Sequence, residues 1–138
     1  MGSIENSLQE YLTNLREQNK ILLNINCQLS IQLQLVQENN WDALDELLKE
    51  TSSLVAKRED LAAAAERIKS DTADELGIKS LDGKLADKIP QEYLTPILTE
   101  INRMRSILER SNELTLENSN RLKVKIEEGR VIELNNSC

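Results

Sequence analysis

The 138-residue chain contains no histidine and no phenylalanine, and it has only one tryptophan, two tyrosines, four glycines and two prolines. Without histidine it lacks Ser-His-Asp triads, imidazole zinc sites and the histidine-containing di-iron sites of helical bundles. Scarce glycine and proline leave little material for the tight turns that a sheet protein needs. These absences argue against several enzyme classes and against a β-rich fold.

The apolar residues are mostly aliphatic. Leucine occurs 23 times and isoleucine 12 times, against four valines. Because sheets and compact globules usually draw on aromatic and β-branched residues, this composition favours helices that pack through aliphatic side chains. We predict an all-α protein with a single domain, residues 1–138. Its architecture is expected to be an elongated antiparallel three-helix bundle, in which a short helical crossover joins a coiled-coil hairpin to a third long helix.

Cysteine usage, hydropathy and charge indicate the setting of the protein. Cys27 and Cys138 form no CxxC pair, which fits a reducing cytoplasm, where an unpaired cysteine is usually a small core residue. The sequence has no run of about 18 apolar residues, and its start, MGSIENS, lacks the apolar core of a secretion signal. The net charge of -7 disfavours nucleic acid and anionic membranes as partners. We therefore expect a cytoplasmic protein that neither binds nucleic acid nor inserts into a membrane.

The first predicted helix covers residues 4–38. Apolar residues recur at one heptad position, which is typical of helix–helix packing. They are Leu8, Leu15, Leu22, Leu29 and Val36. Few residues of this helix are charged, and glutamine is frequent towards its end. The glutamines are Gln28, Gln32, Gln34 and Gln37. Its surface should be polar but weakly charged, and therefore cheap to desolvate against another chain.

The second predicted helix covers residues 41–76. Asn40 is placed to cap its start, because the side-chain oxygen can accept a hydrogen bond from the first turn. Gly77 stands where a left-handed residue commonly ends a helix. Trp41 is expected to pack over the end of the hairpin rather than to stack on a ligand. The apolar stripe of this helix consists of Leu44, Leu47, Leu48, Leu54, Val55, Leu61, Ala62, Ala65 and Ile68.

The remaining residues form a crossover, a third helix and a short tail. The crossover, 77–95, is irregular but contains a short amphipathic helix that Ser80 could cap. The third helix is placed at about 96–128, followed by a loose tail over 129–138. Pro90 and Pro96 both suit a helix start, so residues 91 and 96 stay open as its first residue.

The third helix is uneven along its length. Its first half, from Leu94 to Leu108, has a continuous apolar face, but the same heptad position then reaches Thr115. Asparagine and serine accompany the later leucines, so this half should open at a lower free energy. Two interpretations stay open: a frayed C-terminal helix, or a displaceable helix or groove that receives an amphipathic helix from a partner.

Catalytic and metal-binding patterns are absent from the sequence. The acidic triplets 42/45/46 and 71/74/75 lack the spacing and turn glycine of a calcium loop, and acids near a helix start are favoured by the helix dipole alone. Phosphate-binding glycine loops and nucleophile elbows do not occur. We expect no enzyme activity, no cofactor and no metal.

The chain resembles the FlgN family of flagellar export chaperones and, more distantly, FliT. Three stretches carry the likeness: LVQENNWDALDELLKETSSLVAKREDL from Leu35 to Leu61, the crossover ELGIKSLDGKLADKIP, and ILERSNELTLENSNRL from Ile107 to Leu122. The likeness lies in the order and spacing of these stretches, which cover most of the chain. The ending departs from the family pattern, because the chain stops soon after Gly129.

The resemblance implies a cytoplasmic type III export chaperone. It would bind the C-terminal helices of hook-associated proteins of the hook-filament junction, prevent premature assembly, and contact export-gate or ATPase-complex components. It places client binding on the last helix, at Leu108, Asn112, Leu114, Leu116, Asn118, Leu122 and Ile126. The alternative is a structural coiled-coil protein that tethers or oligomerises other proteins. Monomer and homodimer are both left open.

Overall fold

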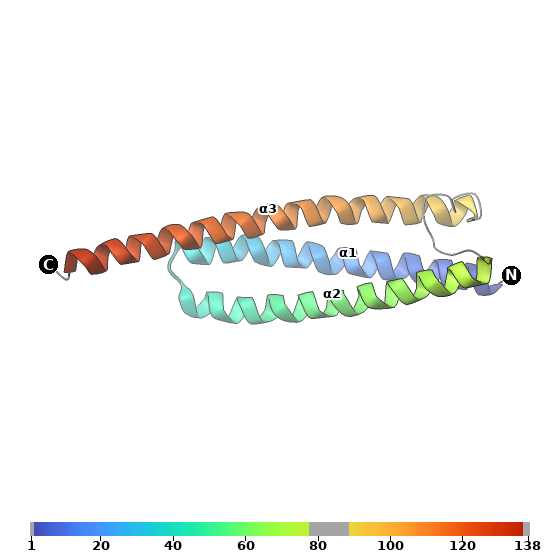
Figure 1. Cartoon of the computed structure of the whole chain (residues 1–138), viewed down its shortest axis with the longest axis horizontal. Helices are drawn as coiled ribbons and strands as arrows, with labels where there is room; N and C mark the ends of the chain where they lie inside the picture. Colours follow the sequence, from blue (N-terminus) through green and yellow to red (C-terminus); the bar gives the residue numbers. More distant parts are fainter. Residues whose placement is uncertain (1, 78–88, 137–138) are drawn as a thin grey trace.

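The chain folds into three long helices that run up, down and up along a common axis (Figure 1). They are α1 (Gly2–Gln37), α2 (Trp41–Leu76) and α3 (Gln91–Asn136). The computed structural model describes residues 2–77 and 89–136, and the side chains within 4–77 and 89–129. The predicted all-α, three-helix fold is confirmed. α1 is the central helix, because it packs against both α2 and α3, whereas α2 and α3 touch each other little.

Local signals at both ends of α2 act as predicted. The Asn40 side-chain oxygen accepts a hydrogen bond from the Ala43 amide at 3.4 Å, which satisfies a first-turn donor. Gly77 has a φ of 71° and donates its amide to the Asp74 carbonyl at 3.1 Å. Glycine suits this left-handed position because it has no Cβ to clash with the carbonyl.

The third helix starts at the earlier of the two residues left open by the sequence and extends past its predicted end at about 128. It begins at Gln91, because the Pro90 carbonyl accepts hydrogen bonds from the amides of Tyr93 and Leu94, both at 3.0 Å. Pro96 therefore lies inside the helix. At the other end α3 continues through Gly129 to Asn136, since a helical glycine costs only about 1 kcal/mol and need not end a helix. The predicted crossover helix with its Ser80 cap lies outside the described residues.

The apolar core lies mainly between the first half of α1, the second half of α2 and the first half of α3. One cluster contains Leu8, Tyr11, Leu12, Leu15, Ala65 and Ile97. A second contains Leu22, Ile25 and Ile107, with Leu54 and Leu108 at its edge. Beyond Leu108, Leu114 is the only buried apolar side chain of α3 among residues 109–129. More apolar surface is therefore buried between the helices near the start of α1 than near the corner between α1 and α2.

Polar side chains continue the core where apolar ones are missing. Asn19 donates to the buried carboxylate of Glu100 at 2.7 Å, which ties α1 to α3. Gln32 is buried and donates to the Thr51 hydroxyl at 3.0 Å, so it does not belong to the polar surface predicted for this helix. Cys27, expected in the core, is exposed. Side-chain amides and hydroxyls thus join all three helices.

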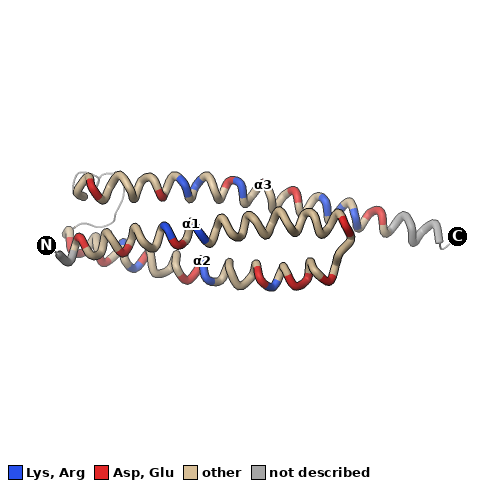
Figure 2. Tube along the Cα trace, turned by 180° about the vertical axis from the view of Figure 1, so that it is seen from behind, with Lys and Arg blue, Asp and Glu red and all other residues tan. Residues whose placement is uncertain are grey.

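The elongated shape leaves a large surface in contact with solvent. The accessible area is 9199 Å², whereas a compact protein of 15.7 kDa would expose about 7,300 Å². Acidic positions outnumber basic ones along α2, whereas positions of both signs are interspersed along α3 (Figure 2). Each helix therefore keeps one face open to solvent.

Within the parts of the chain that the structure describes, no helix combines the length and the apolar character needed to cross a membrane.

Candidate partner-binding surface

The structure divides the seven predicted binding residues between the bundle interior and its surface. Leu114 is 2% exposed, and Leu108 packs at the edge of the second core cluster. The Asn118 amide donates to the Leu29 carbonyl at 3.0 Å and to Gln32 at 3.4 Å, both on α1. These three residues hold α3 on α1. The four that remain exposed are Asn112, Leu116, Leu122 and Ile126.

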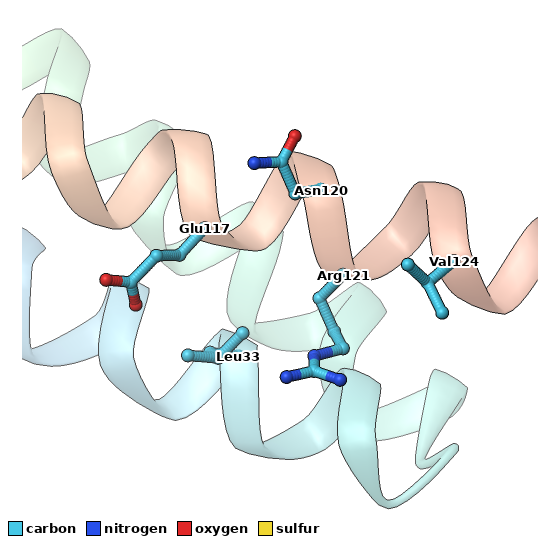
Figure 3. Close-up of a pocket in the computed structure, with 5 residues that line it drawn as sticks. All are labelled: Leu33, Glu117, Asn120, Arg121 and Val124. Carbon is cyan, nitrogen blue, oxygen red and sulfur yellow. The ribbon is translucent and has the colours of Figure 1, made fainter.

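The exposed apolar residues of α3 do not share one side of the helix. Leu122, Val124 and Ile126 alternate with lysines, and a spacing of two residues distributes them around a helix of 3.6 residues per turn. Val124 lines a hollow with Leu33 of α1 (Figure 3). Leu122 and Ile126 are four residues apart, and each is two residues from Val124. These two leucine and isoleucine side chains therefore lie together on the flank of α3 that is opposite Val124.

A second apolar row lies on α2. Trp41, Leu48 and Val55 are seven residues apart and all exposed. Leu61 and Ile68 occupy the other flank of α2, where they line an open hollow together with outer residues of α1. The row through Trp41 and Leu48 is therefore turned towards α3, just as Leu122 is turned towards α2.

Hydrogen bonds fix the relative height of these two rows. Gln32 contacts both Thr51 of α2 and Asn118 of α3, so these two residues lie at one level of the bundle. Leu48 lies about one turn from Thr51, and Leu122 one turn from Asn118, both in the direction of the corner between α1 and α2. Leu48 and Leu122 consequently lie level with each other. We call the set Trp41, Leu48, Leu122 and Ile126 the corner face.

The hollow on the other side of α3 has a different character. It measures about 350 Å³ and is lined by Leu33, Glu117, Asn120, Arg121 and Val124. The side chains of Glu117 and Arg121 lie on either side of Leu33, while that of Asn120 points away (Figure 3). It is a shallow, open depression with charged edges, unlike the enclosed apolar pockets that hold small molecules.

The charges around the corner face differ between its two rows. α2 begins with Asp42, Asp45 and Glu46, whereas Lys123 and Lys125 neighbour the α3 row. Acidic groups therefore lie beside the α2 row of the corner face, and basic groups lie beside its α3 row.

Among the described residues, no group of three His, Cys, Asp or Glu side chains could hold a metal. Burial, and then Glu66, raise the pKa of Tyr11, but this tyrosine lies near the opposite end of α1.

The α2 half of this surface was missed by the sequence interpretation. Trp41, Leu48 and Val55 do show the seven-residue spacing of a contact row, but it was assigned to packing inside the hairpin or over its end. Periodicity cannot separate a contact row that is filled within the chain from one that stays open.

Comparison with known proteins finds no matching family model, no curated protein and no solved structure. The FlgN resemblance therefore stays a prediction.

Proposed function

We propose that this protein is a FlgN-like export chaperone that binds the C-terminal helical segment of a hook-filament junction protein along the corner face. The observation that supports this most is the exposure of four large apolar side chains near one end of the bundle, which no segment of the described chain covers: Trp41 and Leu48 on α2, and Leu122 and Ile126 on α3. Two apolar rows on neighbouring helices suit a guest helix with a single apolar stripe.

The energetics of the bundle suit temporary binding. An unassembled client segment exposes apolar residues that aggregate unless another surface covers them. The corner face can cover such residues without nucleotide hydrolysis. The apolar side chains of the guest leave water when they pack against those of the corner face, and this burial drives binding. Beside Asp42 and Asp45, basic residues on the flank of the guest would add favourable charge contacts of modest strength. The guest is therefore expected to be an amphipathic helix whose flank towards α2 is basic.

The chain carries its own probe for this binding. Trp41 is the only tryptophan and belongs to the corner face. A tryptophan-free peptide from the client C-terminus should shift its fluorescence to shorter wavelength as the indole leaves water. Leu48→Asp and Leu122→Asp should each weaken binding by about tenfold to a hundredfold, since one leucine contact is replaced by a charge that must be desolvated.

A matched control is available on α3. Leu98 is 48% exposed, close to the 45% of Leu48, but it lies 24 residues before Leu122 on α3. Leu98→Asp should leave client binding unchanged, and circular dichroism should show native helix content for all three variants. Equal loss of binding in Leu98→Asp, or no loss in Leu122→Asp, would show that the corner face is not the site.

The structural coiled-coil alternative makes a different prediction. The end of α3 projects beyond the corner between α1 and α2 (Figure 1), as a tethering helix would. A tether should form a stable oligomer that Leu122→Asp dissolves, and its fluorescence should not respond to client peptides. A chaperone would work in the cytoplasm and pass its client to components of the export gate or its ATPase complex, which pull-down with full-length and truncated junction proteins can test.

A further inference from the structure

The outer face of α1 is unusual for a solvent-exposed helix face. The sequence contains no charged residue between Lys20 and Glu38, although 30% of the whole chain is charged. Solvent-exposed helix faces normally carry charged side chains. Here the exposed positions are instead filled by small, apolar or amide side chains: Leu23, Asn24, Cys27, Ser30, Ile31 and Gln34.

Leu23, Cys27 and Ile31 form the apolar centre of this face. They are four residues apart, so they occupy successive turns on one side of α1. Leu23 is 50% exposed and Ile31 46% exposed, because α2 and α3 both pack on the other side, around Leu22 and Ile25. We call Leu23, Cys27 and Ile31 the α1 outer face. Since it lies apart from the corner face, a role for it does not depend on the proposed function.

The two ends of this face carry opposite charges. Arg16 lies on the same side towards the start of α1 and has only a 3.9 Å contact with Glu100. Lys20 is adjacent and pairs with Glu17 at 3.5 Å. Glu38 follows the end of α1, and the acidic start of α2 comes next. Arg16, Glu17 and Lys20 together carry a net charge of +1; along α1 they are followed by uncharged residues and then by the negative charge of Glu38.

We propose that the α1 outer face is a homodimer interface, in which two copies of α1 pack antiparallel about a two-fold axis at Cys27. Leu23 and Ile31 are each four residues from Cys27, so this axis places Leu23 of one copy against Ile31 of the other. Arg16 and Glu38 are each eleven residues from Cys27, so they also become neighbours across the interface. The pairing is isologous, as two-fold symmetry requires.

Charge selects a second copy as the occupant. Two chains that each carry a net charge of -7 repel each other over most of their surfaces. The centre of the α1 outer face carries no charge, so two copies do not repel each other there. In the antiparallel orientation, Arg16 of one copy also lies near the oppositely charged Glu38 of the other. From Arg16 to Glu38 the face is about 33 Å long but only one helix wide, so the dimer should dissociate in the micromolar range.

Sedimentation equilibrium across a concentration series tests this directly. The native protein should convert from 15.7 kDa to twice that mass as its concentration rises. Leu23→Glu combined with Ile31→Glu should raise the dissociation constant by about a hundredfold or more, because four carboxylates would be buried without partners. Leu98→Glu, at an equally exposed position on α3, should leave it unchanged. A protein that is monomeric throughout, or a dimer insensitive to the double change, would overturn the proposal.

Thiol cross-linking tests the orientation. In a Cys138→Ser background, mild oxidation should link two copies through Cys27, while a Cys27→Ser/Ser53→Cys control, with its thiol on α2, should stay unlinked. In a background lacking both native thiols, Leu23→Cys chains should cross-link with Ile31→Cys chains when mixed, and poorly with themselves. Preferential linking of Leu23→Cys chains to one another would indicate parallel packing and refute the antiparallel axis. Client binding should survive Leu23→Glu/Ile31→Glu, which separates this test from that of the proposed function.

Discussion

Leu114 and Leu116 form a matched pair for testing how α3 is held, because they lie two residues apart and differ sharply in exposure. Leu114 is 2% exposed and Leu116 is 62% exposed. Leu114→Ala removes three carbon groups from the interior, worth about 0.8 kcal/mol each, and the cavity raises the total to about 2.5–4 kcal/mol. Leu116→Ala removes groups already in water and introduces a better helix former, so its effect should stay within about 0.5 kcal/mol.

Urea unfolding followed by circular dichroism measures both free energies of unfolding. Hydrogen exchange adds the location: Leu114→Ala should speed exchange between residues 111 and 126, while Leu116→Ala should not. Leu116→Ala should weaken client binding only if the client helix contacts the side of α3 that carries Leu116. If Leu114→Ala costs less than about 1 kcal/mol and matches Leu116→Ala, the second half of α3 is not docked on α1 in solution, and the corner face loses one of its two rows.

Three further predictions concern the bundle itself. Burial, and then Glu66, raise the pKa of Tyr11 above 10.0, so the unfolded chain loses the phenol proton at lower pH than the folded chain does. The free energy of unfolding should therefore fall as the pH rises through about 10. Tyr11→Phe should flatten the accompanying decline in melting temperature. Gly77→Ala should cost about 1 kcal/mol in urea unfolding, because alanine is strained at a φ of 71° even though its Cβ meets no atom. Asn19→Leu should cost about 2–3 kcal/mol by removing the 2.7 Å donor of the buried Glu100 carboxylate, and Asn19→Leu/Glu100→Leu should recover most of that loss.

The fold follows from local patterns that sequence displays directly. The heptad from Leu8 to Val36 identifies the inner side of α1, and Asn40 and Gly77 mark the ends of α2 through interactions that span only a few residues. The ends of α3 could not be fixed in this way. Pro96 and Gly129 are both ordinary boundary residues, yet each is accommodated inside the helix at a cost that the rest of α3 outweighs.

The candidate surface was predictable only in part, because half of it depends on pairing between helices. A leucine such as Leu114 looks the same in sequence as Leu116, and only the direction of α1 decides which one is buried. Gln32 illustrates the same limit for polar residues. Glutamine is common on surfaces, and its burial here depends on partners on two other helices, Thr51 and Asn118.

The polar contacts of the second half of α3 connect its stability to the proposed role. The buried leucines and isoleucines of the first half hold α3 through area removed from water, which opening would lose entirely. In the second half, Asn26 bonds Ser111, and Asn118 bonds α1 while its own side-chain oxygen stays buried without a partner. Such bonds fix the register between helices but are largely replaced by water when they open. A guest helix bound at the proposed corner face would therefore lie against the half of α3 that opens at lower free energy, while the apolar half keeps the chain folded.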